Sequence, residues 1–299
     1  MKLFYADHFV LPLPAGHRFP MEKYSMLRST LRSSGRFAEA DFLVPAAASD
    51  AEILRCHDRD YLQRVADGLL SAEETRRIGF PWSAGMVERS RRSAGATLAA
   101  CRTALTDGCG VNMAGGTHHA HRDFGAGFCV FNDAAIAARA MQAEGRVGTV
   151  AIIDCDVHQG DGTASILDGD ASIFTFSMHG ARNYPFRKAR SDLDIELEDA
   201  TGDASYLAHL GEGLERVFAH CRPELVIYLA GADPFIDDRL GRLALSRDGL
   251  LARDRMVLET CRRHSVPIAI AMAGGYARNI ADTVAIHAAT ILLASEHLA

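Results

Sequence analysis

Five short apolar runs, separated by segments with helical periodicity, are the feature of this sequence that most restricts its fold. Each run is four to six residues long and is bounded by Gly, Asp, Pro or a cluster of polar residues. Continuous apolar runs of this length are typical of strands that are buried on both faces of a parallel sheet. The runs are residues 111–114, 149–153, 172–177, 225–230 and 268–273.

Helical patterns lie between these runs and after the last of them. Asp133 and Ser246 stand where an N-cap or first-turn residue is expected. Because strands alternate with helices, the sequence predicts a doubly wound α/β fold with helices on both faces of the sheet. The predicted helices are residues 133–143, 205–220, 246–264 and 279–297.

Composition excludes several classes of protein. The chain has 32 Lys and Arg against 38 Asp and Glu, and this net charge of −6 argues against a nucleic-acid-binding surface over the whole protein. No run of about 18 apolar residues is present, so we expect no membrane insertion. The seven cysteines form no CxxC pair, which indicates reduced thiols. The first twenty residues do not resemble a signal peptide, so we expect the chain in the cytoplasm.

Glycines and polar side chains gather directly after four of the five apolar runs. In open parallel sheets, ligands bind beyond the carboxyl ends of the strands. The sequence therefore predicts one functional site to which all four segments contribute. These segments are residues 115–119, 154–158, 231–234 and 274–276.

Asp154, Asp156 and His158 are spaced two residues apart after the second run. On an extended strand they would point the same way, and three such groups are costly to bury without a cation. Asp156 and His158 with one remote carboxylate would form a three-ligand set that leaves a position open for water, as catalytic zinc sites do. Taken alone, the segment fits a capped strand end before a helix that starts at Asp161 equally well.

The other strand ends supply candidates for the remaining chemistry. Asp233 precedes Pro234, which cannot donate a sheet hydrogen bond, and it is the natural third ligand. His118 and His119 follow two glycines, and histidine is suited to proton transfer near neutral pH. Tyr276 also follows two glycines and could hydrogen-bond to an oxyanion, although by itself it is better explained as an aromatic loop anchor.

In five blocks the sequence resembles the zinc-dependent histone deacetylase family, whose members share the arginase/deacetylase fold. The blocks occur in family order and span about half the chain. The resemblance implies a single catalytic domain, residues 1–299, with a central, mostly parallel sheet of about eight strands and helices on both faces. The blocks are Gly115–Ala120 (GGTHHA), Gly127–Asp133 (GFCVFND), Asp154–Gly162 (DCDVHQGDG), Ala230–Pro234 (AGADP) and Ala273–Tyr276 (AGGY).

The resemblance implies two kinds of metal ion. One catalytic Zn²⁺ would be held by Asp156, His158 and Asp233. A structural monovalent cation, K⁺ or Na⁺, would be held by the side chains of Asp154 and Ser177 and by the carbonyl groups of Asp156, His158 and Met178.

The resemblance also implies catalytic roles. His119 would take a proton from the attacking water and give it to the leaving amine, and Asp161 would orient it. His118 would be its supporting neighbour, oriented by Asp154, and Tyr276 would donate to the oxyanion. The expected reaction is metal-assisted hydrolysis of an N-ε-acyl-lysine amide in a protein or peptide.

Gly127, Phe128 and Tyr184 would line a narrow acyl channel. Small residues such as Gly115 and Gly274 surround the predicted foot of this channel, where acyl groups larger than acetyl would fit unless a bulky side chain such as Phe19 or Met21 fills the space. Three further segments resemble the class IV branch and its bacterial relatives, which remove acyl groups other than acetyl. They are Ile78–Ser83, Asn183–Pro185 and Asp238–Ser246.

Three alternatives belong to other functions. A deacylase of a small acylated amine, such as an acetylpolyamine, would use the same residues. An arginase-like ureohydrolase would need acidic metal ligands at two positions that Gly160 and Phe235 occupy, so a second metal lacks ligands. A non-catalytic binding module would be expected to have lost Tyr276, a histidine or a metal ligand, and all are present.

Overall fold

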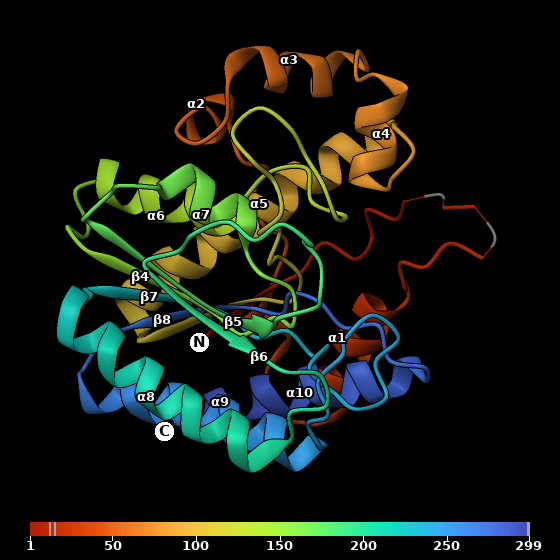
Figure 1. The fold of residues 1–299 in the computed structure, drawn as a ribbon. Helices are drawn as coiled ribbons and strands as arrows, with labels where there is room; N and C mark the ends of the chain where they lie inside the picture. The colour runs from red at the N-terminus through yellow and green to blue at the C-terminus, as the bar shows by residue number, and fades with distance from the viewer. Residues whose placement is uncertain (12, 15, 298–299) are drawn as a thin grey trace.

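A computed structural model describes residues 1–11, 13–14 and 16–297 of the chain (Figure 1). Eight strands form one sheet in the order β2-β1-β3-β8-β7-β4-β5-β6, and every neighbouring pair is parallel. The predicted α/β fold with a mostly parallel sheet is therefore confirmed. The strands are β1 (Lys2–Phe4), β2 (Phe42–Leu43), β3 (Cys109–Asn112), β4 (Val150–Asp154), β5 (Ile173–Gly180), β6 (Leu193–Leu197), β7 (Leu225–Leu229) and β8 (Ile268–Ala271).

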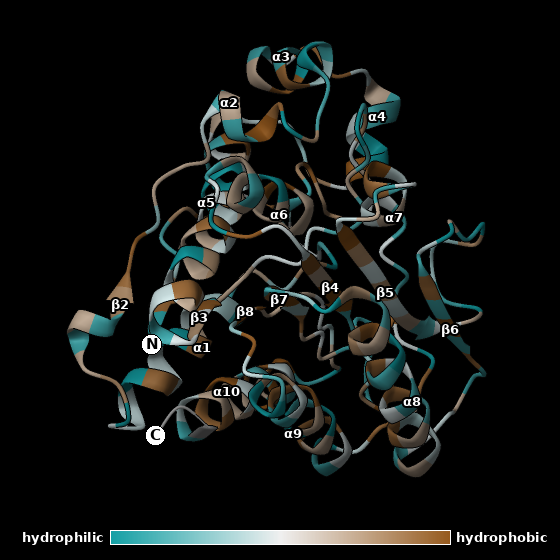
Figure 2. Cartoon of the chain, turned by 90° about the vertical axis from the view of Figure 1, so that its left-hand side faces the viewer, coloured by the Kyte–Doolittle hydropathy of each residue, from teal (hydrophilic) through white to brown (hydrophobic). Residues whose placement is uncertain are grey.

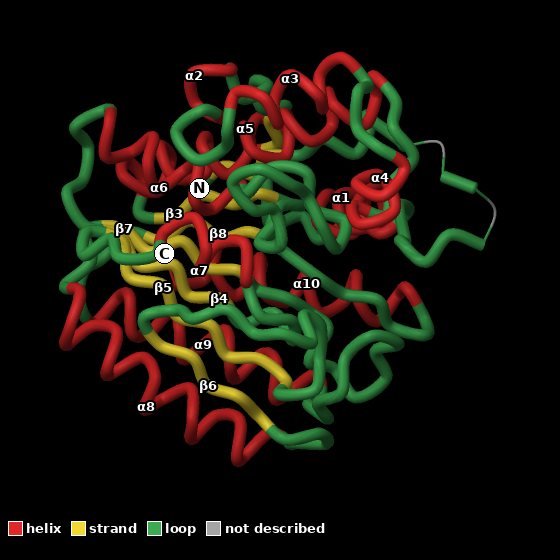
Figure 3. Tube along the Cα trace, turned by 45° about the horizontal axis from the view of Figure 1, so that its top comes forward, coloured by secondary structure: helices red, strands yellow, loops and turns green. Residues whose placement is uncertain are grey.

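Helices cover both faces of the sheet (Figures 1 and 3). On one face α1, α8, α9 and α10 pack over one hydrophobic cluster, and on the other α5, α6 and α7 pack over a second, with α2, α3 and α4 outside α5. The helices are α1 (Lys23–Ser33), α2 (Asp50–Ile53), α3 (Arg59–Asp67), α4 (Ala72–Ile78), α5 (Ala84–Asp107), α6 (Asp133–Ala143), α7 (Asp161–Leu167), α8 (Asp203–Cys221), α9 (Arg247–Arg263) and α10 (Ile280–His297), with a 3₁₀ turn at Glu39–Asp41.

Strand β4 illustrates why apolar runs become central strands. Its side chains alternate between the two faces, so Ala151 and Ile153 enter the first cluster while Val150 and Ile152 enter the second. A strand between two helical layers therefore needs an apolar residue at every position. The hydropathy colouring shows the resulting apolar strands in the middle of the molecule (Figure 2).

Most predicted boundaries agree with the structure to within a few residues. Helix α6 has the predicted bounds, and Ser246 caps α9 by accepting a hydrogen bond from the backbone of Gly249 at 2.9 Å. Asp133 lies in the first turn of α6, one of the two positions predicted for it, and Asn132 is the N-cap. One boundary was wrong: β3 lies two residues earlier than predicted, at Cys109–Asn112, because the chain turns at Gly115 and Gly116 soon after the strand.

The cysteine and membrane expectations can also be compared with the structure. All seven cysteines are free thiols and six of them are buried, as predicted for core residues. Within the described part of the chain, no helix combines the length and the apolar character that crossing a membrane requires.

Candidate active site and metal centre

The four polar segments meet at one edge of the sheet. Strands β3, β8, β7 and β4 are consecutive in the sheet, so their carboxyl ends, and the segments that follow them, lie side by side. A pocket of about 740 Å³ opens at this edge. Residues from three of the four segments line it, among them His118, His119, Asp156, His158 and Tyr276.

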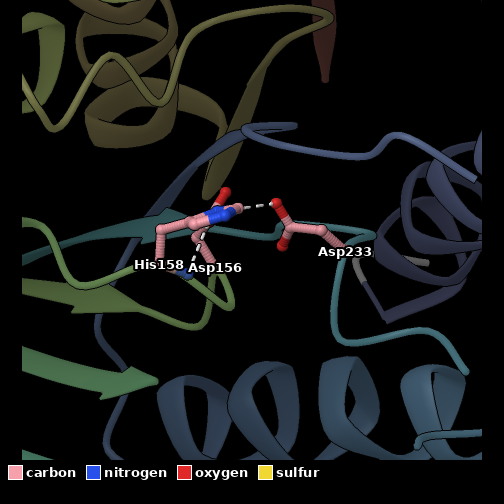
Figure 4. A group of neighbouring side chains, drawn as sticks. All are labelled: Asp156, His158 and Asp233. Atoms are coloured by element: carbon pink, nitrogen blue, oxygen red, sulfur yellow. Dashed lines mark hydrogen bonds and ion pairs between the residues drawn. The ribbon is translucent and has the colours of Figure 1, made fainter. Parts of the chain in front are cut away.

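Asp156, His158 and Asp233 form a cluster whose potential ligand atoms all lie within 4.8 Å of one another (Figure 4). Nδ1 of His158 is 2.9 Å from Oδ1 of Asp156 and 3.3 Å from Oδ2 of Asp233. Strand β4 ends at Asp154, but the alternation of side chains continues beyond it because Cys155 and Val157 remain in the hydrophobic core. That packing turns the intervening residues toward the pocket.

The cluster fits a zinc ion because of its donor atoms and because one buried carboxylate oxygen accepts no hydrogen bond. Oδ2 of Asp233 is buried and accepts no hydrogen bond in the described structure, its one contact being the ion pair with His158, while Oδ1 accepts a hydrogen bond from the backbone of Val157 at 2.9 Å. Gly274 borders the space: a Cβ atom there would lie 1.9 Å from Oδ2 of Asp233 and 2.5 Å from Oδ2 of Asp156. One imidazole and two carboxylates around a buried space are a donor set that catalytic zinc uses.

The electrostatics of the cluster favour a cation. Burial and the charge of Asp156 raise the pKa of Asp233 to about 7. Burial alone would lower the pKa of His158, but its contacts with Asp156 and Asp233 outweigh this effect and raise it to about 10. Both shifts show that the two carboxylates stabilise positive charge between them, as a cation-binding site does.

His118 and His119 are both buried, and each has a carboxylate partner for Nδ1. Asp154 accepts from His118 at 2.7 Å and Asp161 from His119 at 2.6 Å. These are the two carboxylates that were predicted as orienting partners, and that role in catalysis stays a prediction. His121 also contacts Asp161, at 3.3 Å, a partner that the sequence did not reveal.

The two histidines differ in charge. Burial opposes protonation of His118, but the charges of Asp154 and Asp156 outweigh it and raise its pKa to about 9. For His119, burial and the neighbouring charge of His118 lower the pKa to about 4, against the hydrogen bond to Asp161. His119 is therefore neutral near pH 7, with Nδ1 donating to Asp161 and Nε2 left to accept a proton.

Tyr276 is buried at the pocket wall and is held through its backbone. Its N–H donates to Oδ2 of Asp238 at 2.6 Å, and its carbonyl accepts from the backbone N–H of Arg239 at 3.2 Å and from Nε at 3.1 Å. The hydrogen bonds of Tyr276 within the described structure involve its backbone and not its hydroxyl group. The buried ammonium of Lys23 lies 5.3 Å from the centre of the Tyr276 ring. Sequence reasoning missed Lys23, Asp238 and Arg239 as supports of this tyrosine.

Gly127, Phe128 and Tyr184, which were predicted to line an acyl channel, all line the pocket. A Cβ atom at Gly127 would lie 2.6 Å from Cδ2 of His119, so only glycine lets the chain pass this close to the imidazole. The Tyr184 ring stands edge-on to the His119 ring at 4.9 Å. Phe128 adopts a positive φ of 67° and packs beside Phe19 at 5.2 Å.

The residues predicted for a monovalent cation adjoin the cluster of Asp156, His158 and Asp233. Asp154 and Ser177 are direct neighbours in the β4–β5 register, and both are buried. Oδ1 of Asp154 accepts from the backbone of Asp156 at 3.1 Å, and the hydroxyl of Ser177 contacts Nδ1 of His179 at 3.0 Å. The cation site formed with the carbonyl groups of Asp156, His158 and Met178 stays a prediction.

A buried arginine that sequence reasoning missed lies beneath the site. Arg253 donates from Nη1 to the carbonyl of Gly231 at 2.5 Å and to that of Cys155 at 3.4 Å. The carbonyl of Gly231 lies two residues before Asp233, and that of Cys155 one residue before Asp156, both candidate zinc ligands. Asp254 pairs with Arg253 at 2.8 Å and accepts from Tyr228 at 2.6 Å. The sequence feature that could have indicated this buried ion pair is an Arg next to an Asp on the core side of a predicted helix.

Comparisons with known proteins agree with this geometry. The family model of the histone deacetylase domain matches residues 17–292. An uncharacterised protein of Picosynechococcus sp. PCC 7002 is 43% identical over 283 residues, covering 95% of this chain and 94% of that protein. Histone deacetylase 2 of Arabidopsis thaliana is 32% identical over 281 residues, covering 90% and 73% of the two chains.

The solved structures resemble the whole fold. A histone deacetylase homologue solved in complex with SAHA superposes with a TM-score of 0.83 at 22% identity, covering 99% of this chain and 88% of that chain. The sequence matches extend over nearly the whole chain, and the blocks from which the resemblance was inferred lie within the matched range. This chain is a hydrolase of the histone deacetylase family.

Proposed function

We propose that this protein is a zinc-dependent deacylase that hydrolyses the amide bond of N-ε-acyl-lysine in proteins or peptides. The observation on which the proposal rests is the buried cluster of Asp156, His158 and Asp233, two members of which line the same pocket as His119 and Tyr276. A zinc ion held there would polarise the acyl carbonyl and acidify a water molecule. A cavity with a few convergent polar groups is where such chemistry is expected.

The protein's own groups supply proton transfer and oxyanion stabilisation. His119, neutral and fixed by Asp161, can take a proton on Nε2 from the attacking water and return it to the departing amine. The raised pKa of His118 keeps a positive charge beside it, which disfavours early protonation of His119. Tyr276 can donate its hydroxyl hydrogen to the oxygen on which negative charge develops.

Two alternative functions are less well supported. Gly160 and Phe235 provide no carboxylate for a second metal, and the described residues contain one three-ligand group. This composition disfavours the two-metal ureohydrolase. The retained histidine pair and Tyr276 disfavour a binding module without catalysis.

We further propose that the acyl group is larger than acetyl. Apolar and small residues, including Leu11, Ala114, Gly115 and Val130, line the pocket. Phe19 lines it too, whereas Met21 does not lie among the lining residues. Each buried methylene would contribute about 0.8 kcal/mol, so a few carbons outweigh a modest misfit. The resemblance to the class IV branch supports the same preference.

One panel tests the reaction and the acyl preference together. A single peptide is prepared with acetyl-, propionyl-, lactyl-, octanoyl- or myristoyl-lysine, and kcat/KM is measured for each with zinc-loaded protein. We expect at least one longer acyl group to exceed acetyl. A kcat/KM for acetyl-lysine about tenfold higher than for every other acyl group would overturn the acyl preference. Elemental analysis that finds two Mn²⁺ per chain instead of one Zn²⁺ would overturn the zinc assignment.

A further inference from the structure

The mouth of the pocket is strongly basic in a chain that is acidic as a whole. Seven arginines line the pocket, and the one acidic residue in the lining is Asp156 of the metal cluster. The whole chain, in contrast, has 38 acidic and 32 basic residues. Six of these arginines are exposed or lie on exposed loops and helix ends around the opening: Arg18, Arg76, Arg77, Arg182, Arg239 and Arg242.

Protein carboxylates compensate only part of this charge. Asp199 is shared between Arg182 at 3.9 Å and Arg242 at 3.0 Å, so the pair keeps a net positive charge. Within the described residues, Arg18 and Arg76 have no carboxylate at ion-pair distance. Arg77 forms an ion pair with Glu73 at 3.2 Å. Together the six exposed guanidinium groups face two carboxylates, those of Glu73 and Asp199, so the opening keeps a net positive charge for an external anion.

These arginines come from separate segments and surround the opening. Arg18 lies in the N-terminal loop, Arg76 at the end of α4, Arg182 after β5 and Arg239 in the loop after β7. A ligand that enters the pocket thus meets positive charge from several directions. Such an arrangement steers oppositely charged partners and repels cationic ones.

An exposed aromatic residue at the same opening favours a peptide as the partner. Phe186 lines the pocket yet is 89% exposed, beside the Tyr184 ring at 6.2 Å. Exposed aromatic and arginine side chains are the residue types that dominate protein binding sites. A small inorganic anion would make no use of the phenyl ring, whereas a polypeptide strand across the mouth would cover it.

We propose that the substrate is an acylated lysine within an acidic protein segment, with Asp or Glu on both sides of the modified residue. This inference rests on the proposed deacylase function. The aliphatic stem of the lysine enters the pocket, and flanking carboxylates pair with the guanidinium groups, which match carboxylates in a two-pronged geometry. Basic tails of the histone type and polyamines are disfavoured because their positive charges would face arginine.

Three peptides that share one acyl-lysine test the proposal. Their flanking residues are Asp and Glu, Ser and Gln, or Lys and Arg, and kcat/KM is measured in low salt and in 0.5 M NaCl. We expect the acidic peptide to exceed the neutral one by about tenfold in low salt, and the difference to shrink at high salt as screening shortens the range of the charges. Cleavage of the neutral peptide separately tests the deacylase function.

Paired charge reversals identify the arginines responsible. We expect the double variant Arg76→Glu/Arg182→Glu to prefer the basic peptide over the acidic one. The control Arg216→Glu/Arg255→Glu makes the same change in net charge at exposed positions of α8 and α9, outside the pocket lining, and keeps the preference for the acidic peptide.

Several results would overturn the proposal while leaving the deacylase function intact. One is equal kcat/KM for the three peptides. Another is a preference for the acidic peptide that survives in the Arg76→Glu/Arg182→Glu variant. A third is a higher kcat/KM for a small phosphorylated acyl-amine than for the acidic peptide. Failure of all three peptides to be cleaved would instead refute the deacylase function.

Discussion

Gly274→Ala is the smallest change that should separate metal binding from folding in this protein. The added methyl group would lie 1.9 Å from Oδ2 of Asp233 and 2.5 Å from Oδ2 of Asp156. The backbone at Gly274 does not adopt a positive φ, so alanine itself is permitted there. The clash therefore falls on two candidate zinc ligands and not on the conformation of the chain.

The geometry sets the size of the effect. Real Cβ contacts are essentially never shorter than 3.0 Å, so the methyl group and the Asp233 oxygen must separate by about 1.1 Å. Metal–ligand distances tolerate only about 0.2 Å. Loss of a single supporting contact already lowers zinc affinity about 10–100-fold. With two direct ligands displaced, we expect a loss of at least about 100-fold, or about 2.8 kcal/mol.

The assay is zinc affinity by competition with a chelating indicator, measured with circular dichroism on the same samples. We expect weak zinc binding and little turnover in a folded chain, since overpacking costs only about 1–3 kcal/mol. Gly211→Ala is the control, because Gly211 lies in α8 and a Cβ atom there would meet only Sδ of Met256 in α9, at an ordinary contact distance of 3.8 Å. A Gly274→Ala variant with wild-type zinc affinity and turnover would refute the ligand assignment.

Three other substitutions test the remaining assignments. Tyr276→Phe should lower kcat by about 10²–10³ with little change in KM, and a lowered melting temperature with normal turnover would indicate a structural role instead. His119→Ala should abolish turnover while zinc, measured by elemental analysis, stays bound. His118→Ala should reduce turnover less, and a larger loss in His118→Ala than in His119→Ala would mean that the two roles must be exchanged. Arg253→Met leaves a buried carboxylate unpaired and should reduce the free energy of unfolding in urea by about 3–5 kcal/mol. Adding Asp254→Asn to Arg253→Met removes the unpaired charge and keeps an acceptor for the Tyr228 hydroxyl, so the double variant should recover part of this loss. No recovery would show that the unpaired carboxylate is not the source.

The central part of the sheet could be predicted because burial on both faces leaves a direct trace in the sequence. Strands β4, β7 and β8 are continuous apolar runs, and the polar residues that follow them are the site. The edge strands could not be predicted in this way. Strand β2 has two residues and β6 is only partly buried, so neither produces a long apolar run.

The longest helix escaped prediction for a related reason. Helix α5 contains many Ala, Gly and Ser residues, so its hydrophobic periodicity is weak although much of it is buried. Gly95 shows what these small residues do: a Cβ atom there would lie 1.9 Å from the carbonyl of Ala46. Close packing selects small residues at such positions, and small residues give little contrast between the faces of a helix.

The candidate zinc ligands can be predicted from the sequence, whereas the arginines at the pocket opening cannot. Asp156 and His158 are recognisable because their spacing and the preceding strand place both beside one another. The arginines of the mouth are ordinary surface residues one by one, and the stretch from Arg18 to Arg242 covers most of the chain. Only folding brings them to one opening. It follows that the catalytic residues of such an enzyme can be predicted from short segments at strand ends. Its choice of substrate depends on charged residues that are far apart in the sequence and close together only in the fold.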